Sequence, residues 1–318
     1  MPLCFSRGAL FRIGFMHDET YEDQFGRIRR RVRRMTRAVR WPLKRMVGAP
    51  RTILVELRWR LGDEIMALPV FESLRAKYPS DYISVLTNFP ELFEEHPFVD
   101  SVNAVPAVVD RYVLLRGAPR DVYRLQHYCR VAGVGMPVSR PHVYFQDWST
   151  GLLEGLAEGQ GPVVAVAPGT TWPTKHWRMD RWRELCGVLQ ARGARVVELG
   201  RNTEPVGVGL NLMDKTSVRE AACVLHQADL LISCDSGLMH LALAANTPVV
   251  GLFGPTEPDI LIQNEPNFYP IRSTQECQGY WNKAEVEPDM RVCPWKHACC
   301  LDSITVDHVM EVMEKRWL

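Results

Sequence analysis

The sequence lacks several features that would assign it to common classes. No stretch reaches the roughly 18 uninterrupted apolar residues of a membrane-spanning helix. Arg7 and Arg12 interrupt the only apolar run near the N-terminus, so this run does not predict a secretory signal peptide. No Asn-Gly dipeptide marks a β-hairpin. We therefore expect a cytoplasmic protein whose strands are joined by crossovers.

The totals describe an ordinary globular chain. With 318 residues, 46% of them hydrophobic, and a formal net charge of +1, the chain is long enough for two domains. Five of the nine cysteines stand singly at apolar or semi-apolar positions, which favours reduced thiols over a disulfide framework. These are Cys4, Cys129, Cys186, Cys223 and Cys234.

The charge is unevenly distributed. Residues 27–45 hold nine arginines and one lysine without an acid, and Ile28, Val32, Met35 and Val39 recur at helical spacing. This pattern predicts a basic amphipathic helix that binds an anionic membrane surface, binds nucleic acid, or packs on the main body. We favour the membrane surface, because no nucleic-acid module follows. Residues 1–26 carry no readable signal, and 1–50 form an arm and linker.

The first domain is predicted over residues 51–155. Thr52–Leu57 has the composition of a buried strand, and we expect 61–68 to form a loop or single turn because Pro69 more readily begins a helix. Asp63 would then lie at the carboxyl end of the strand, where ligands enter open α/β sheets. It is a candidate general base, although a lone aspartate can equally form a turn.

The alternation of strands and helices continues along both halves of the chain. It predicts parallel sheets. The further strands expected in the first half are 82–86, 99–105 and 111–115, with helices over 90–95 and 119–131. A glycine-rich hinge over 147–161 leads into the second domain, assigned to 156–318, with strands 163–167, 195–199, 209–212, 230–233 and 248–253.

Two loops of the second domain have the composition of an anion site. Asp235, Ser236 and Gly237 join a buried strand to a helix, where free backbone N–H groups can bind phosphate, and His240 follows one turn later. Taken alone, Asp235 and Ser236 could simply cap the helix, and His240 could be an ordinary core histidine. The second loop, 168–177, combines a glycine and hydroxyls with a lysine but has neither GxGxxG nor Walker spacing.

Together these motifs resemble the bacterial heptosyltransferases of glycosyltransferase family 9. The matching residues are Leu61-Gly62-Asp63 with Pro69, Pro168-Gly169-Thr170-Thr171 with Lys175 and Trp177, Asp235-Ser236-Gly237 with His240, Ala242 and Ala244, and Phe253-Gly254-Pro255-Thr256. Their order and separation match over about residues 51–315. The resemblance implies an α/β GT-B fold, in which two Rossmann-like domains with parallel sheets face each other across a cleft.

The resemblance also implies a reaction and roles. It implies inverting transfer of heptose from ADP-heptose to a lipopolysaccharide-type glycolipid, without a required metal or cofactor. Asp63 matches the catalytic base and Lys175 a residue that holds and stabilises the pyrophosphate. The remaining donor-binding positions are Thr170, Thr171, Glu204, Asp235, Ser236, Gly237, His240 and Thr256. Alternatives are another sugar, a protein acceptor, or a non-catalytic sugar-nucleotide-binding protein.

A group of cysteines lies near the C-terminus. Cys277, Cys293, Cys299 and Cys300 fall within 24 residues, with His297 among them. Such a set could hold a structural zinc or iron ion, but it contains no CxxC pair, and adjacent cysteines rarely ligate one ion together. We interpret this segment as a reduced loop.

Overall fold

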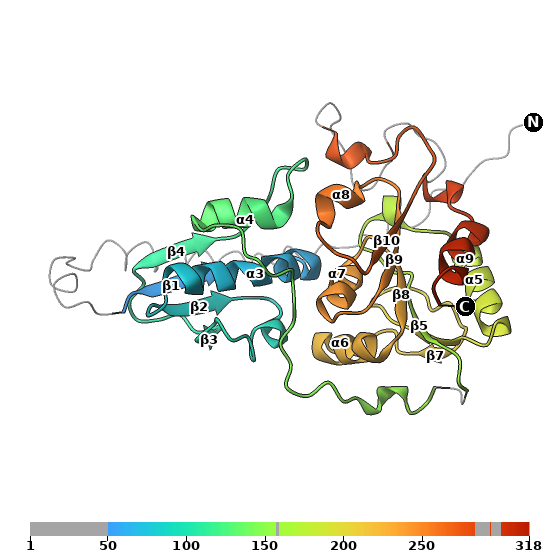
Figure 1. Cartoon of the computed structure of the whole chain (residues 1–318), viewed down its shortest axis with the longest axis horizontal. Coiled ribbons are helices and arrows are strands. Elements are labelled where there is room, and N and C mark those ends of the chain that lie inside the picture. Colours follow the sequence, from blue (N-terminus) through green and yellow to red (C-terminus); the bar gives the residue numbers. More distant parts are fainter. Residues whose placement is uncertain (1–49, 157–158, 284–292, 294–299, 318) are drawn as a thin grey trace, which may run out of the picture.

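The computed structural model describes residues 50–156, 159–283, 293 and 300–317, which fold as two α/β units lying side by side (Figure 1). The smaller sheet has the strand order β3-β2-β1-β4, and the larger has the order β10-β9-β8-β5-β6-β7. Every strand pair in both sheets is parallel, as predicted. Residues 1–49, including the predicted basic helix, lie outside the described residues.

The elements follow the predicted alternation. The first unit contains β1 (Thr52–Glu56), α3 (Leu61–Lys77), β2 (Tyr82–Leu86), β3 (Ser101–Val102), β4 (Arg111–Leu114) and α4 (Arg124–Ala132). The second contains β5 (Val163–Ala167), α5 (Met179–Ala191), β6 (Arg195–Glu198), β7 (Leu210–Asn211), α6 (Val218–Gln227), β8 (Leu230–Cys234), α7 (Gly237–Ala244), β9 (Val249–Phe253), α8 (Pro258–Leu261), β10 (Phe268–Arg272) and α9 (Val306–Glu314). Short 3-10 turns lie at Pro90–Leu92, Gly151–Leu153, Pro173–Lys175, Tyr280–Asn282 and Cys300–Ser303.

The start of α3 contradicts the prediction that residues 61–68 form a loop or single turn. The helix runs from Leu61 through Pro69 without a break. An internal proline loses one backbone hydrogen bond and costs about 3 kcal/mol in an isolated helix. Here Ile65, Phe71 and most residues between them are fully or almost fully buried, and this burial offsets the loss.

Several other boundaries differ from prediction. The strands expected over 99–105 and 209–212 shorten to β3 and β7, and the helix expected over 90–95 is a single 3-10 turn. The helix expected over 119–131 begins only at Arg124. Propensity therefore located these elements but did not fix their ends.

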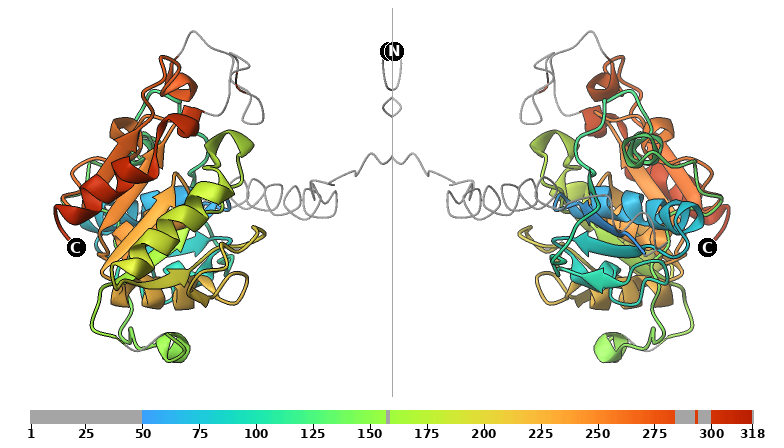
Figure 2. Two further views of the ribbon diagram at one scale, coloured as in Figure 1. Left: turned by 90° about the vertical axis from the view of Figure 1, so that its right-hand side faces the viewer. Right: turned by 90° about the vertical axis from the view of Figure 1, so that its left-hand side faces the viewer.

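Helices cover both faces of the larger sheet. On the outer face, α5 and α9 bury Trp182, Leu185 and Met313 against alternate strand residues (Figure 2). On the inner face, residues of α6 and α7 join a single apolar cluster that also contains α3 and the smaller sheet. The two units therefore share a continuous core along one side of the larger sheet. The predicted domain boundary at 155/156 stays a prediction.

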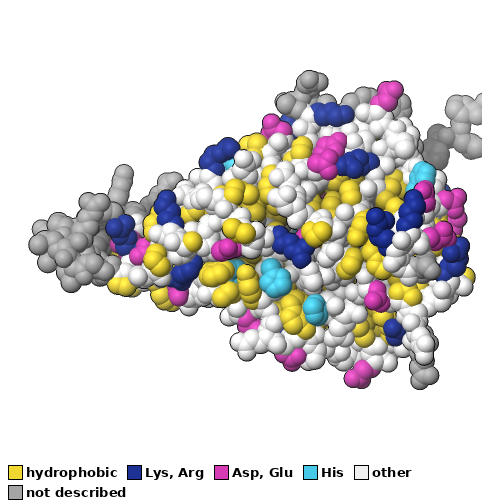
Figure 3. Space-filling view, viewed as in Figure 1, with side chains coloured by type: hydrophobic (Ala, Val, Ile, Leu, Met, Phe, Trp, Pro, Cys, Tyr) yellow, Lys and Arg dark blue, Asp and Glu magenta, His cyan; other side chains and the backbone are white. Residues whose placement is uncertain are grey.

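Two further observations concern the charge of the surface and the apolar character of the helices. On the face in Figure 3, the lysine and arginine side chains of the described residues are interspersed with acidic ones. Within residues 50–156, 159–283 and 300–317, no helix combines the length and apolar character needed to cross a bilayer.

Candidate functional site at the contact between α3 and α7

The first turns of α3 and α7 meet end to end between the two sheets (Figure 1). A methyl group added to Gly62 would lie 2.7 Å from Cδ2 of His240, and one added to Gly237 would lie 3.0 Å from Cβ of Leu61. The glycines are therefore needed for close approach. The result places two helix N-termini, each with unpaired N–H groups and a partial positive charge, beside one another.

Asp235 is a buried carboxylate at the centre of the site. Its Oδ2 accepts a charge-assisted hydrogen bond from Lys175 Nζ at 2.5 Å and a second from the Thr256 hydroxyl at 2.8 Å. Burial alone would raise the pKa of Asp235, but the Lys175 charge and the neighbouring His240 outweigh it, so the pKa is lowered. Asp235 therefore stays ionised and holds Lys175 in a fixed position.

The loop before Lys175 closes around this ion pair. The Lys175 ammonium lies 3.8 Å from the centre of the Trp172 ring. The Thr171 hydroxyl accepts a hydrogen bond from Arg60 at 3.3 Å, and the Thr170 hydroxyl donates to the Asp235 carbonyl at 3.5 Å. The predicted donor loop is thus brought against both the Asp235 turn and the first unit.

The Asp235 turn leads directly into α7. The Ser236 side chain accepts a hydrogen bond from the Met239 N–H at 3.4 Å. It therefore caps the helix, which is one of the two interpretations that the sequence allowed. Gly237 is the first helical residue. Capping leaves the other first-turn N–H groups available to an anion, so the two interpretations are compatible.

Asp63 lies close to this donor-side cluster, in the first turn of α3. Its Oδ1 forms an ion pair with Nη1 of Arg124 at 2.6 Å. Burial raises the pKa of Asp63, and the charges of Arg124, Arg60 and Lys175 oppose that effect. The structure therefore brings the predicted base and the predicted pyrophosphate ligand into electrostatic contact, although they come from different units.

His240 stands between Gly62 and the Asp235 carboxylate. Burial lowers the pKa of its imidazole to about 4, against the opposing attraction of Asp235. The ring is therefore neutral near pH 7, with one nitrogen that donates a hydrogen bond and one that accepts. His240 and Asp235 lie close enough to interact electrostatically, and the donor-binding role of His240 stays a prediction.

Glu204 forms an ion pair with an arginine outside this group of residues. Its side chain is 69% exposed and forms an ion pair with Arg183 at 2.6 Å. A ribose hydroxyl would have to compete with this arginine. The assignment of Glu204 to the donor stays a prediction.

Three of the four C-terminal cysteines are among the described residues. Burial and the neighbouring Cys293 raise the pKa of the Cys277 thiol. Cys300 is buried at the start of the 3-10 turn Cys300–Ser303. Within the described part of the chain, no group of three or more histidine, cysteine or acidic side chains is arranged to hold a metal ion. Cys299 and His297 lie outside it.

Two site residues were not predicted from the sequence. Arg124 was hidden inside a segment expected to be an ordinary helix, and its role follows only from the folding of α4 against α3. Glu64 is fully buried and accepts hydrogen bonds from the Thr87 hydroxyl and from the Trp59 and Asn88 N–H groups. It thereby fastens the loop before Asp63 to the end of β2. The sequence contains one indication of this role, because Glu64 stands between Asp63 and an apolar run, where a charged side chain needs hydrogen-bond partners.

Comparisons of the sequence with known proteins identify relatives of this chain. The lipooligosaccharide heptosyltransferase 2 of Haemophilus influenzae is 32% identical over 115 residues, covering 31% of this chain and 33% of the relative. The lipopolysaccharide heptosyltransferase 2 of Salmonella typhimurium is 25% identical over 207 residues, covering 56% of this chain and 57% of the relative. The matches thus span between a third and somewhat over half of these relatives' length.

A solved structure shows the same fold. The dodecameric iron-containing heptosyltransferase TibC of enterotoxigenic E. coli, solved in complex with ADP-D-beta-D-heptose, superposes with a TM-score of 0.70 at 20% identity. The match covers 84% of this chain and 76% of TibC. The two parallel sheets are accordingly those of the GT-B fold.

The family model described as "Glycosyltransferase family 9 (heptosyltransferase)" matches residues 126–290, which is more than half of the chain. These residues include the Lys175 loop, the Asp235 turn and Thr256. The chain therefore belongs to glycosyltransferase family 9, the heptosyltransferase family.

Proposed function

We propose that this chain transfers a heptose from ADP-heptose to a lipopolysaccharide-type glycolipid by a single inverting displacement. The observation that carries the proposal is the convergence of Asp63 with the Lys175–Asp235 pair at the paired N-termini of α3 and α7. A carboxylate that can accept a proton thus lies near a cation that can stabilise a departing phosphate group. Relatives in the family are named lipopolysaccharide heptosyltransferases, which supports this choice of substrates.

The donor side of the reaction rests on Lys175 and the first turn of α7. As the bond between the sugar and the phosphate lengthens, negative charge moves onto the pyrophosphate, and a fixed cation with helix N–H groups stabilises that charge. Lys175 is already held by Asp235, so little reorganisation is needed when the charge develops. Thr170 and Thr171 add hydroxyl groups along the same loop.

The acceptor side rests on Asp63. A base must be ionised at working pH yet basic enough to take a proton from a sugar hydroxyl. Burial makes Asp63 more basic than an exposed aspartate, while Arg124 limits the effect. Attack from this side, opposite the departing pyrophosphate, inverts the configuration of the transferred sugar.

Two alternatives differ in their substrates or in catalysis. Another donor sugar or a protein acceptor would use the same pyrophosphate loop, because such a loop recognises phosphate groups, which these donors share. A non-catalytic binding protein would bind the donor without turnover. The Asp63 and Lys175 side chains argue against it, because binding alone does not need a base.

The proposal is tested by incubating the full chain with ADP-heptose and deacylated lipopolysaccharide from heptose-deficient bacteria. The expected product carries one added heptose, and NMR of its anomeric proton should show inverted configuration. Saturation-transfer NMR with ADP-, UDP- and GDP-sugars tests the nucleotide. Preference for a nucleotide other than ADP would refute the donor assignment, and retained configuration would refute the single displacement.

We also propose that the chain works in the cytoplasm at the inner membrane, with residues 27–45 attracted to anionic lipid. A glycolipid acceptor would be presented at such a surface. Each basic residue near an anionic membrane contributes about 1 kcal/mol to binding, so the ten basic residues of this segment would together be sufficient for attachment.

A further inference from the structure

Exposed apolar side chains gather at the end of α4. Among the described residues, the large hydrophobic side chains that are exposed are Tyr82, Val105, Val131, Met136 and Val138. The last three fall within residues 131–138, here called the α4 loop, and their exposed fractions are 41%, 51% and 101%. Single exposed apolar residues are ordinary, but several on one short segment indicate a contact surface.

The α4 loop is fixed at both ends. Gly133 ends the helix in the left-handed region, with φ at 65°, and the N–H of Val134 donates to the Cys129 carbonyl at 3.0 Å. Beyond the loop, the Ser139 hydroxyl donates to the Glu72 carboxylate of α3. Pro137 restricts the backbone between these two anchors. The loop therefore has little backbone freedom to lose when its apolar side chains bind a partner.

The charge around the loop is positive. No aspartate or glutamate occurs from residue 122 to residue 146. Arg130 is exposed directly before the loop, and Lys77, which is also exposed, donates to the Gly133 carbonyl at 2.6 Å. Neither side chain forms an ion pair with an acid of the described residues. The exposed apolar residues thus have cations beside them that are available to an anionic partner.

The loop lies at the edge of the smaller sheet where the strands begin. The Arg111 guanidinium, at the start of β4, donates to the Ala132 carbonyl, and Ile53 of β1 pairs with Arg111. The chain segment that follows the basic residues 27–45 enters β1 at this same edge. Asp63 lies at the other end of α3, about 21 Å away along the helix axis. A surface that contacts the α4 loop therefore leaves the candidate site uncovered.

We propose that the α4 loop inserts into the headgroup region of an anionic bilayer, where Met136 and Val138 contact lipid and Arg130 and Lys77 meet lipid phosphates. Three apolar side chains are few for a stable protein–protein interface, which has about 20–30 residues on each side. A bilayer contact needs fewer, because it adds to a second signal. The basic segment 27–45 supplies that signal. The inference adds to the proposed membrane location and does not depend on the transfer reaction.

The test measures how the full chain partitions onto vesicles of phosphatidylcholine with phosphatidylglycerol. The double variant Met136→Ser/Val138→Ser should lower the partition coefficient about three- to tenfold, because two apolar side chains no longer leave water. This ratio should be the same at low salt and at about 0.15 M salt, since salt does not screen apolar burial. Val138→Trp should raise partition about fivefold or more, because tryptophan favours the membrane interface. Such a gain cannot result from misfolding.

Val105 provides the matched control. This exposed valine follows β3, at the opposite edge of the smaller sheet, so neither Val105→Ser nor Val105→Trp should change partition. Unchanged partition in the double variant would overturn the inference, as would an equal gain from Val105→Trp and Val138→Trp.

Sedimentation velocity tests whether a second copy of the chain covers the loop instead. A dimer that dissociates in the double variant, with vesicle binding unchanged, would also overturn the inference. A chain that binds vesicles through the α4 loop but transfers no heptose would refute the proposed function and leave this inference intact.

Discussion

Replacing Asp63 with asparagine separates its chemical role from its structural one. Asparagine has nearly the same shape and keeps an oxygen that can accept from Arg124, but it cannot take a proton near pH 7. If Asp63 is the base, turnover should fall about 10²–10⁴-fold. The affinity for ADP should change little, because the proposed role of Asp63 is at the acceptor and not at the nucleotide.

The same substitution also weakens an ion pair, and this effect must be kept apart from catalysis. The Asp63 and Arg124 side chains are 11% and 22% exposed, so the pair is neither fully buried nor free in solvent. Exposed pairs contribute up to about 1 kcal/mol, and breaking a buried pair costs about 3–5 kcal/mol. We expect a loss of about 1–3 kcal/mol in the free energy of unfolding.

A second ion pair of the first unit provides the control. Arg75 and Asp100 also lie 2.6 Å apart, at the opposite end of α3 from Asp63, and the Asp100 carboxylate is 35% exposed against 11% for Asp63. Asp100→Asn should therefore lower stability by a similar or smaller amount while turnover is retained. Single-turnover rates and denaturant unfolding of both variants make the comparison.

The pH dependence gives an independent measurement. The base must be ionised, so kcat/KM should fall as pH drops through the pKa of Asp63. Because burial raises that pKa, the fall should occur at a higher pH than for an ordinary aspartate. Asp63→Asn should abolish this acid limb. An Asp63→Asn protein with more than about a tenth of the original rate would refute the assignment of the base.

Four further outcomes are expected. Lys175→Ala should both weaken ADP binding in calorimetry and slow single turnover, and unchanged ADP affinity would contradict its role. Gly62→Ala forces a methyl group against His240 and should cost about 1–3 kcal/mol in chemical denaturation, whereas Gly187→Ala, which meets open space in α5, should not destabilise. Deleting residues 27–45 should abolish co-sedimentation with anionic vesicles at low salt but spare activity on a soluble acceptor; equal loss of both would mean that the arm belongs to the fold. Protein purified without chelator should contain no stoichiometric zinc or iron, and one ion per chain would overturn the interpretation of the C-terminal cysteines as a reduced loop.

The sequence was most informative where local chemistry decides the structure. The spacing of Ser217 and Glu220 in the sequence predicts a capping box, and the box forms, because both hydrogen bonds involve residues of a single helical turn. The buried runs that became β5, β8 and β9 were also recognised, since a parallel sheet covered on both faces requires continuous apolar strands.

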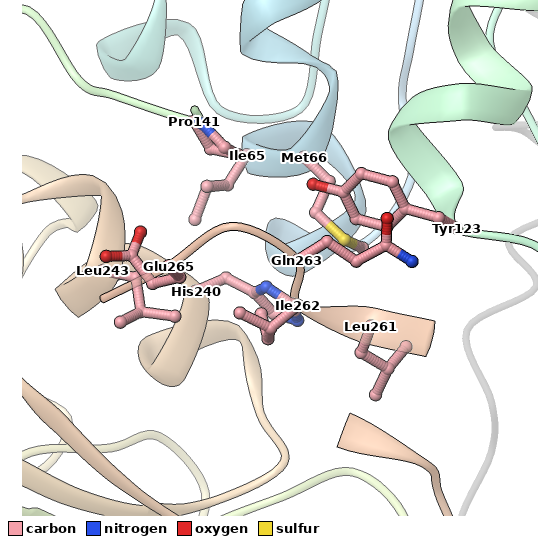
Figure 4. A pocket seen from close by; sticks show the side chains of 10 residues that line it. All are labelled: Ile65, Met66, Tyr123, Pro141, His240, Leu243, Leu261, Ile262, Gln263 and Glu265. Atoms are coloured by element: carbon pink, nitrogen blue, oxygen red, sulfur yellow. The ribbon is translucent and has the colours of Figure 1, made fainter. Parts of the chain in front are cut away.

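The sequence was least informative where distant residues decide the structure. Pro69 signals a helix start in isolation, and only the burial of α3 between the two units makes the longer helix favourable. The Asp63–Arg124 pair joins positions 61 residues apart, and no periodicity indicates it. The small pocket lined by Ile65, Tyr123, Pro141, His240 and Leu261 likewise combines five separate segments, which only the folded chain brings together (Figure 4).

The contact between Gly62 and His240 also affects how the two units can move. Atoms packed within van der Waals distance across a boundary cannot separate far without opening a void in the shared core, so this contact acts as a pivot. In any rotation about it, displacement grows with distance from the axis. Asp63 follows Gly62 directly, and Asp235 stands two residues before Gly237, which packs on Leu61, so such a rotation would leave the separation of Asp63 and Asp235 nearly constant.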